Sequence, residues 1–141
     1  MEHYEVKICK SDECIDDAKK IISSVFIYEL TNNEKNTDSL EMYFIAYADD
    51  DQAGAATIKI TGEIAELTAI AVLPLFQQQG VGRDLLKAVF QSLPKKVVKM
   101  ELSSPSDSRA FFYSLGFTEE DAPFLVRERA YQKMVIQLES K

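Results

Sequence analysis

Residues 73–86, LPLFQQQGVGRDLL, place two glycines between an apolar segment and an amphipathic one. Where a strand gives way to a helix, the first N–H groups of the helix have no intrahelical partner and the helix dipole is positive. Gly80 and Gly82 lack Cβ atoms, so an anion can come close to the backbone amides there. Arg83 and Lys87, four residues apart, add positive charge to one helix face. The pattern favours a phosphate-binding turn.

Most other interpretations of these glycines need residues that the sequence lacks. A dinucleotide-binding fingerprint needs a third glycine where Leu85 stands, and a Walker loop needs Gly-Lys-Ser or Gly-Lys-Thr. A tight turn between strand and helix, without any ligand, needs nothing further and stays open at this point.

Hydrophobic periodicity predicts the elements that position this turn. Predicted helices span residues 12–30, 80–93 and 106–115, the last ended by Gly116. Predicted strands span residues 4–9, 41–48, 53–60, 64–73, 97–102 and 129–138. Short turns join three of the strands into an antiparallel meander, and a helix connects the third to strand 97–102, which should therefore pair parallel to it. An α+β fold with a mixed sheet follows, as one domain over residues 1–141, because no repeat or linker interrupts the chain.

Composition and charge narrow the function classes. The formal net charge of −7 argues against nucleic acid as a partner and suits a cationic ligand. Apolar runs fall far short of the roughly 20 residues that span a membrane, so no membrane partner is expected. The N-terminus lacks the features of a secretory signal, which predicts a cytoplasmic protein.

Cysteine and histidine are scarce. Cys9 and Cys14 are the only cysteines, and we expect free thiols because a disulfide over so short a loop adds little to the core. His3 is the one histidine, so no metal site is predicted. A covalent acyl-cysteine mechanism has little support because neither cysteine has a histidine nearby in the sequence.

A second motif decides between a phosphate site and a bare turn. Gln77, Gly80 and Gly82 match the pattern Q/R-x-x-G-x-G/A, and FFYSLGF, residues 111–117, is similar to an F-Y-x-x-L-G-F segment. Together they resemble the GNAT superfamily of N-acetyltransferases, over nearly the whole chain. The resemblance implies a mostly antiparallel sheet flanked by helices, with one splayed parallel strand pair. It also implies acetyl-CoA as cosubstrate.

The resemblance also implies where acetyl-CoA binds. The pantetheine arm would enter between the splayed strands and bond to the backbone, with an N–H near Ile70 polarising the thioester carbonyl. The pyrophosphate would lie on the amides of residues 78–83. The implied contacts are Ile70, Ala71, Val72, Gln77, Gln78, Gln79, Gly80, Val81, Gly82 and Arg83, with Phe112 packing against the coenzyme.

Two residues are candidates for proton transfer. Glu66 stands where many family members carry a glutamate, and it would remove the proton of the amine through water. Strand alternation puts Glu66 on the face of Ile70 and Val72 if no bulge intervenes. Phe112 stands where the family often has a tyrosine acid, so either Tyr113 or water would protonate the leaving thiolate.

The sequence thus predicts an N-acetyltransferase that acts on a primary amine through a ternary complex. A non-catalytic coenzyme A sensor or scaffold stays open as the alternative because of Phe112. The resemblance implies an acceptor site at residues 29–38 and 121–129. Glu29, Glu34 and Asp38 either attract a cationic amine there or only solvate the loop. Whether the protein is a homodimer stays open.

Overall fold

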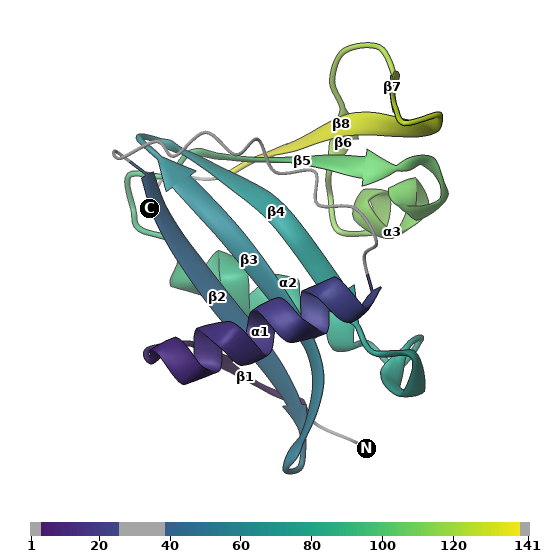
Figure 1. Ribbon diagram of the computed structural model, residues 1–141. Coiled ribbons are helices and arrows are strands. Elements are labelled where there is room, and N and C mark those ends of the chain that lie inside the picture. The colour runs from purple at the N-terminus through teal and green to yellow at the C-terminus, as the bar shows by residue number, and fades with distance from the viewer. Residues whose placement is uncertain (1–3, 26–38, 139–141) are drawn as a thin grey trace.

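Eight strands form one mixed sheet in the computed structural model, which describes residues 4–25 and 39–138 (Figure 1). The strands are β1 (Tyr4–Ile8), β2 (Ser39–Ala48), β3 (Asp51–Thr61), β4 (Ile64–Val72), β5 (Lys99–Pro105), β6 (Thr118–Glu119), β7 (Phe124–Val126) and β8 (Arg129–Gln137). The helices are α1 (Asp12–Val25), α2 (Val81–Ser92) and α3 (Arg109–Ser114), with 3-10 turns at Pro74–Phe76 and Ser106–Ser108. The predicted α+β class is confirmed.

The strand order across the sheet is β1-β2-β3-β4-β5-β8-β6, and β7 pairs with β8. Neighbouring strands are antiparallel except β4 and β5, which are parallel. The predicted meander and the predicted parallel pair are both confirmed. The predicted first helix is confirmed as far as Val25, and its extension to residue 30 lies outside the described residues.

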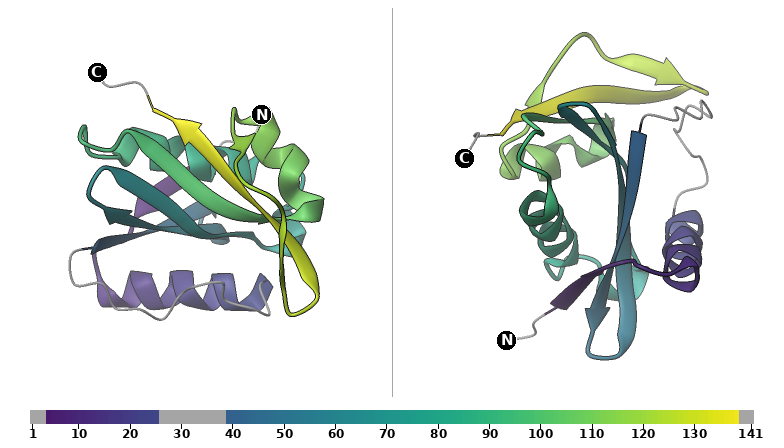
Figure 2. Two further views of the ribbon diagram at one scale, coloured as in Figure 1. Left: turned by 90° about the horizontal axis from the view of Figure 1, so that it is seen from above. Right: turned by 90° about the vertical axis from the view of Figure 1, so that its left-hand side faces the viewer.

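The sheet separates α1 from α2 and α3, as Figure 2 shows. On one face, Ala18 and Ile22 of α1 pack against Ala55 of β3. On the other face, Leu85 of α2 and Phe112 of α3 belong to the larger core. No helix within the described ranges is long and apolar enough to cross a membrane.

A bulge interrupts β4 at Thr68. Thr57 of β3 pairs with Ala69, but the next residue, Ile58, pairs with Leu67, so Thr68 has no register partner. The hydroxyl of Thr68 donates a 3.1 Å hydrogen bond to the carbonyl oxygen of Thr57. One extra residue reverses the alternation of side chains between the two parts of the strand.

The bulge corrects the expected orientation of Glu66. Unbroken alternation would place Glu66 on the face of Ile70 and Val72, which pack toward α2. Because Thr68 adds a residue, Glu66 instead shares the α1 face of the sheet with Ala69 and Ala71.

The pairing of β4 and β5 ends early. Their register covers only residues 64–66 and 99–101, although β4 continues to Val72. Over its whole length β5 pairs instead with β8 on its other side. Beyond residues 66 and 101 the two parallel strands therefore diverge toward their carboxyl ends, as Figure 1 shows. We call this gap between the two strands the splay.

Cys9 and Cys14 form a disulfide, so the prediction of free thiols is wrong. Cys9 follows β1 and Cys14 lies in the first turn of α1, where its amide donates to the hydroxyl of Ser11 at 3.2 Å. This capped turn brings the two Cα atoms to 5.3 Å, a separation that a disulfide spans readily. The bond fixes the entry of the chain into α1.

Reduction of this disulfide should lower the free energy of unfolding by about 2 kcal/mol, because the bond restricts the unfolded chain over a short loop. Urea denaturation with and without dithiothreitol measures the difference. The double variant Cys9→Ser/Cys14→Ser should show no response to the reductant. Equal stability of the oxidised and reduced wild-type protein would contradict the prediction.

Candidate active site

The loop between β4 and α2 is shaped by its own glutamines. The side-chain amide of Gln77 donates to the carbonyl oxygen of Val72 at 3.0 Å, and that of Gln79 donates to Leu75 at 3.2 Å. The hydroxyl of Tyr4 in β1 donates to Oε1 of Gln79 at 2.6 Å. Two of the three glutamines therefore fix the loop, and Tyr4 supports it from a strand that sequence reasoning did not connect with the site.

The N-terminus of α2 presents a run of backbone donors. Within the described part of the chain, the amides of residues 78–83 donate no hydrogen bond to another residue. The first amide with a partner is that of Asp84, which donates to Gly80 at 3.0 Å. We call residues 78–83 the amide cradle. Unpaired amides at the positive end of a helix can hold an anion such as a pyrophosphate.

The two glycines of the cradle are required for different reasons, Gly80 for its backbone conformation and Gly82 for close packing. Gly80 has φ of +87°, which favours glycine, and a Cβ atom there would meet nothing within 4 Å. At Gly82, a Cβ atom would lie 3.1 Å from Cζ of Phe111 in α3. Gly82 therefore lets α3 approach α2 closely. Phe111 contacts the glycine turn, whereas Phe112 lies buried, with its ring edge-on to that of Phe117.

The backbone of β4 faces the splay at alternate residues. The amide of Leu73 donates to Ala53 in β3 at 2.9 Å, which sets the phase of the antiparallel ladder. In an antiparallel pair every second residue bonds to the partner strand, so Ala71, like Leu73, bonds to β3. The main-chain groups of Ile70 and Val72 therefore point the other way, toward the splay. The bond from Gln77 to the carbonyl of Val72 agrees with this orientation.

Glu66 stands where the splay begins. It is exposed on the α1 face, and its register partner across β5, Glu101, belongs to the last paired position before the strands diverge. Its partner across β3 is Lys59. The structure thus brings Glu66 to the closed end of the splay and the amide cradle to its open end.

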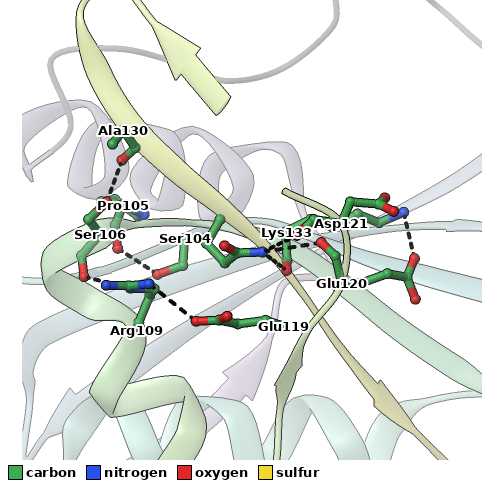
Figure 3. Close-up of polar contacts among 10 residues, drawn as sticks. Ser104, Pro105, Ser106, Arg109, Glu119, Glu120, Asp121, Ala130 and Lys133 are labelled. Carbon is green, nitrogen blue, oxygen red and sulfur yellow. Dashed lines mark hydrogen bonds and ion pairs between the residues drawn. The ribbon is translucent and has the colours of Figure 1, made fainter. Parts of the chain in front are cut away.

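Four charged residues form an ion cluster on the α1 face beside Glu66. Lys99 lies 3.2 Å from Glu101 and 3.4 Å from Glu120, and Lys133 lies 3.5 Å from Glu101 and 3.1 Å from Glu120. The side-chain amide of Gln132 donates to the backbone of Glu120 and holds that turn in place. Figure 3 shows Lys133 and Glu120 in this arrangement. The cluster joins β5 to β8 and to the end of β6.

The bonds within the ion cluster change the proton affinities of its members. Glu101 raises the pKa of Lys99, and Glu120 raises the pKa of Lys133, because each carboxylate accepts a hydrogen bond from the ammonium group. The bond from Lys133 lowers the pKa of Glu120. The lysines therefore stabilise the fold until the pH rises through their raised pKa values, and Glu120 does so until the pH falls through its lowered pKa.

Tyr113 lies apart from Glu66. Its hydroxyl bonds to Glu119 of β6, and this bond raises the pKa of Tyr113. Glu119 also pairs with Arg109 at 3.2 Å, a contact that Figure 3 shows. β8 and β5 separate β6 from β4 in the sheet. Tyr113 itself lies in α3, two residues after Phe111, which contacts Gly82, and its role as the acid stays a prediction.

The expected acceptor segments are described in part. Residues 29–38, with Glu29, Glu34 and Asp38, lie outside the described residues. Residues 121–129 form the turn into β7 and the β7–β8 hairpin, where the ring of Phe124 stacks on Tyr131 with centroids 6.0 Å apart. In the described ranges no group of three or more His, Cys, Asp or Glu could hold a metal ion.

Comparison with known families identifies the class of protein. Residues 9–138 match the family described as the acetyltransferase (GNAT) domain, and the chain therefore belongs to the GNAT acetyltransferases. The family resemblance predicted from the sequence is confirmed. A comparison with curated proteins finds no match.

Solved structures share the fold at low sequence identity. The ribosomal-protein-S18-alanine N-acetyltransferase of Escherichia coli is 20% identical, with a TM-score of 0.74 over 96% of this chain and 94% of that one. A putative N-acetyltransferase from Lactobacillus plantarum is 14% identical, with a TM-score of 0.81 over 96% and 98%. A GNAT acetyltransferase from Elizabethkingia anophelis, solved with acetyl-CoA bound, is 17% identical, with a TM-score of 0.64 over 96% and 98%.

The ion cluster should give the Lys133→Gln variant a pH-dependent loss of stability. At pH 7 the variant should have a lower Tm than the wild type, because Glu101 and Glu120 lose a partner. The difference should shrink as the pH falls through the pKa of Glu120, since a protonated carboxyl group no longer attracts the ammonium group. Thermal melts at several pH values, with exposed Lys96→Gln as control, measure this. An equal Tm difference at pH 3 and pH 7 would be the contrary result.

Proposed function

We propose that this acetyltransferase moves the acetyl group of acetyl-CoA directly to a primary amine, with both substrates bound at once. The splay is the observation that carries the proposal. Its open end adjoins the amide cradle, and its closed end adjoins the carboxylate of Glu66. A single gap in the sheet therefore leads from an anion site to a base.

The coenzyme would bind along this gap. Its pyrophosphate would accept hydrogen bonds from the amides of residues 78–83, beside the positive end of α2. Its pantetheine arm would bond to the main-chain groups of Ile70 and to the N–H of Val72, which β5 leaves unpaired. The exposed side chains of Arg83 and Gln78 would flank the pyrophosphate. Phe111 would support the cradle through its contact with Gly82.

The chemistry begins with the amine, which is mostly protonated at neutral pH. Glu66 would take one proton from the ammonium group through water, since it lies roughly 13 Å along the strand from Ile70. The amine nitrogen would then attack the thioester carbonyl, and the C–N bond would form. The N–H of Ile70 would stabilise the developing oxyanion. As the C–S bond breaks, the attacking nitrogen would lose its second proton to water, and the electron pair of the bond would leave with sulfur as the coenzyme A thiolate.

Water would supply the proton to the departing thiolate. The side chain of Phe112 has no exchangeable proton, and the hydroxyl of Tyr113 is engaged by Glu119. The net reaction converts an ammonium ion and acetyl-CoA into an acetamide, coenzyme A and one released proton. The acceptor would be cationic, because the chain carries a net charge of −7 and the base itself is a carboxylate.

The Glu66→Gln variant tests the proposal. Replacing the base should lower kcat/KM about a hundredfold at pH 7 and remove the decline in rate on the acidic side of the pH profile. Thiol release from acetyl-CoA is measured with spermidine, an aminoglycoside and a lysine-containing peptide as acceptors. Calorimetric titration with acetyl-CoA, with ATP as control, tests whether the variant still binds the cosubstrate.

Unchanged binding of acetyl-CoA by Glu66→Gln, together with the lost rate, is the expected result. A wild-type protein that binds acetyl-CoA but releases no thiol with any of the amines would instead favour a sensor or scaffold. An unchanged pH profile in Glu66→Gln would refute the assignment of the base.

The Tyr113→Phe variant decides how the thiolate is protonated. If water is the acid, the variant should keep kcat within about twofold of the wild type, because the interaction with Glu119 raises the pKa of Tyr113 and makes its hydroxyl a weaker acid. A loss of tenfold or more in kcat, with KM for acetyl-CoA unchanged, would return the acid role to Tyr113. Steady-state kinetics at pH 7 and pH 9 provide the comparison.

A further inference from the structure

A row of charged side chains crosses four strands on the α1 face of the sheet. Glu41 of β2 is the register partner of Lys59 in β3, Lys59 is the partner of Glu66 in β4, and Glu66 is the partner of Glu101 in β5. Partners in a sheet point to the same face, so these side chains are neighbours. Glu66 therefore has one cation and one anion beside it.

Glu101 differs from Glu66 in its own partners. Lys99 lies 3.2 Å from Glu101 on the same strand, and Lys133 lies 3.5 Å from it on β8. The side chain of Glu101 is 23% exposed, which leaves these contacts partly shielded from water. Two ammonium groups thus offset the negative charge of Glu101 beside Glu66.

We propose that Glu101, held by Lys99 and Lys133, is a positioning residue that acts on the reaction through Glu66. The inference rests on the proposed function, because it needs Glu66 to be the base. Without the lysines, the uncompensated negative charge of Glu101 at the neighbouring register position would favour the protonated form of Glu66. The lysines offset the charge of Glu101, so that the carboxylate of Glu66 can accept a proton from the amine.

The groups that face Glu66 come from both neighbouring strands. Lys59 of β3 faces it from one side, with Glu41 of β2 beyond. Glu101 and Lys99 of β5 face it from the other side, and Glu120 and Lys133 complete the ion cluster behind them. Lys99, Lys133, Glu101 and Glu120 carry equal numbers of opposite charges, so the cluster is neutral and Glu66 keeps its own negative charge.

The geometry predicts two opposite effects of charge removal. Glu101→Gln removes a negative neighbour, so the acidic limb of the kcat/KM profile should move to lower pH. Lys133→Gln leaves Glu101 less compensated, so the limb should move to higher pH. Each shift should be on the order of half a pH unit, as expected for a unit charge one or two side chains away near the surface.

The experiment records kcat/KM from pH 5 to pH 9 for the wild type, Glu101→Gln, Lys133→Gln and Lys133→Arg. All variants are assayed with the same amine, the one of the three acceptors that gives the highest wild-type kcat/KM. Ionisation of the acceptor then affects every pH profile equally. Lys133→Arg keeps the charge and should restore the wild-type limb. Lys96→Gln, an exposed lysine outside the cluster, is the matched control.

A purely structural role for the cluster gives a different result. Variants that only loosen the sheet would lose rate without moving the acidic limb, whatever change in Tm accompanies the loss. That outcome, or a shift of Glu101→Gln and Lys133→Gln in the same direction, would overturn the inference.

The Glu66→Gln profile separates this failure from failure of the proposed function. If Glu66→Gln abolishes the acidic limb while the cluster variants leave it in place, only the role of Glu101 is wrong. If Glu66→Gln keeps the limb, the assignment of the base itself is wrong.

Discussion

The site depends on one constraint, which is that the hydrogen bonds between β4 and β5 stop after residues 66 and 101. The opposite edge of β5 is hydrogen-bonded to β8 along its whole length. β5 can therefore diverge from β4 and still keep hydrogen-bond partners for half of its backbone groups. The main-chain groups of Ile70 and the N–H of Val72 are then available to a ligand in the middle of a sheet. A continuous sheet would have used the same groups to bond β5.

The bulge at Thr68 gives the two ends of β4 separate tasks. Toward the carboxyl end, Ile70 and Val72 pack against the core under α2 while their backbone faces the splay. Toward the amino end, Glu66 projects from the α1 face into a row of charged neighbours. In the proposed mechanism one strand thereby joins coenzyme binding to proton transfer, although the two lie on opposite faces of the sheet.

Sequence reasoning succeeded where the signal was local. The glycines after β4, the helical repeat of α2 and the motif at residues 111–117 each lie within a short segment, and they predicted the fold and the place of the cradle. Contacts between distant segments could not be predicted from the sequence. Neighbouring residues in FFY gave no sign that Phe111 would meet Gly82 or that Tyr113 would meet Glu119. Alternation alone could not reveal a bulge, and spacing alone could not pair Cys9 with Cys14.

The early end of the β4–β5 pairing also divides the sheet into two parts. Strands β1 to β4 form one part, with α1 on one face and α2 on the other, and β5 to β8 form the second. Three register positions join the two parts along the sheet. The larger core spans both parts, because Met100 of β5 and Met134 of β8 pack in it with Phe44 of β2. Side-chain packing therefore holds the two parts together where the backbone of the sheet does not.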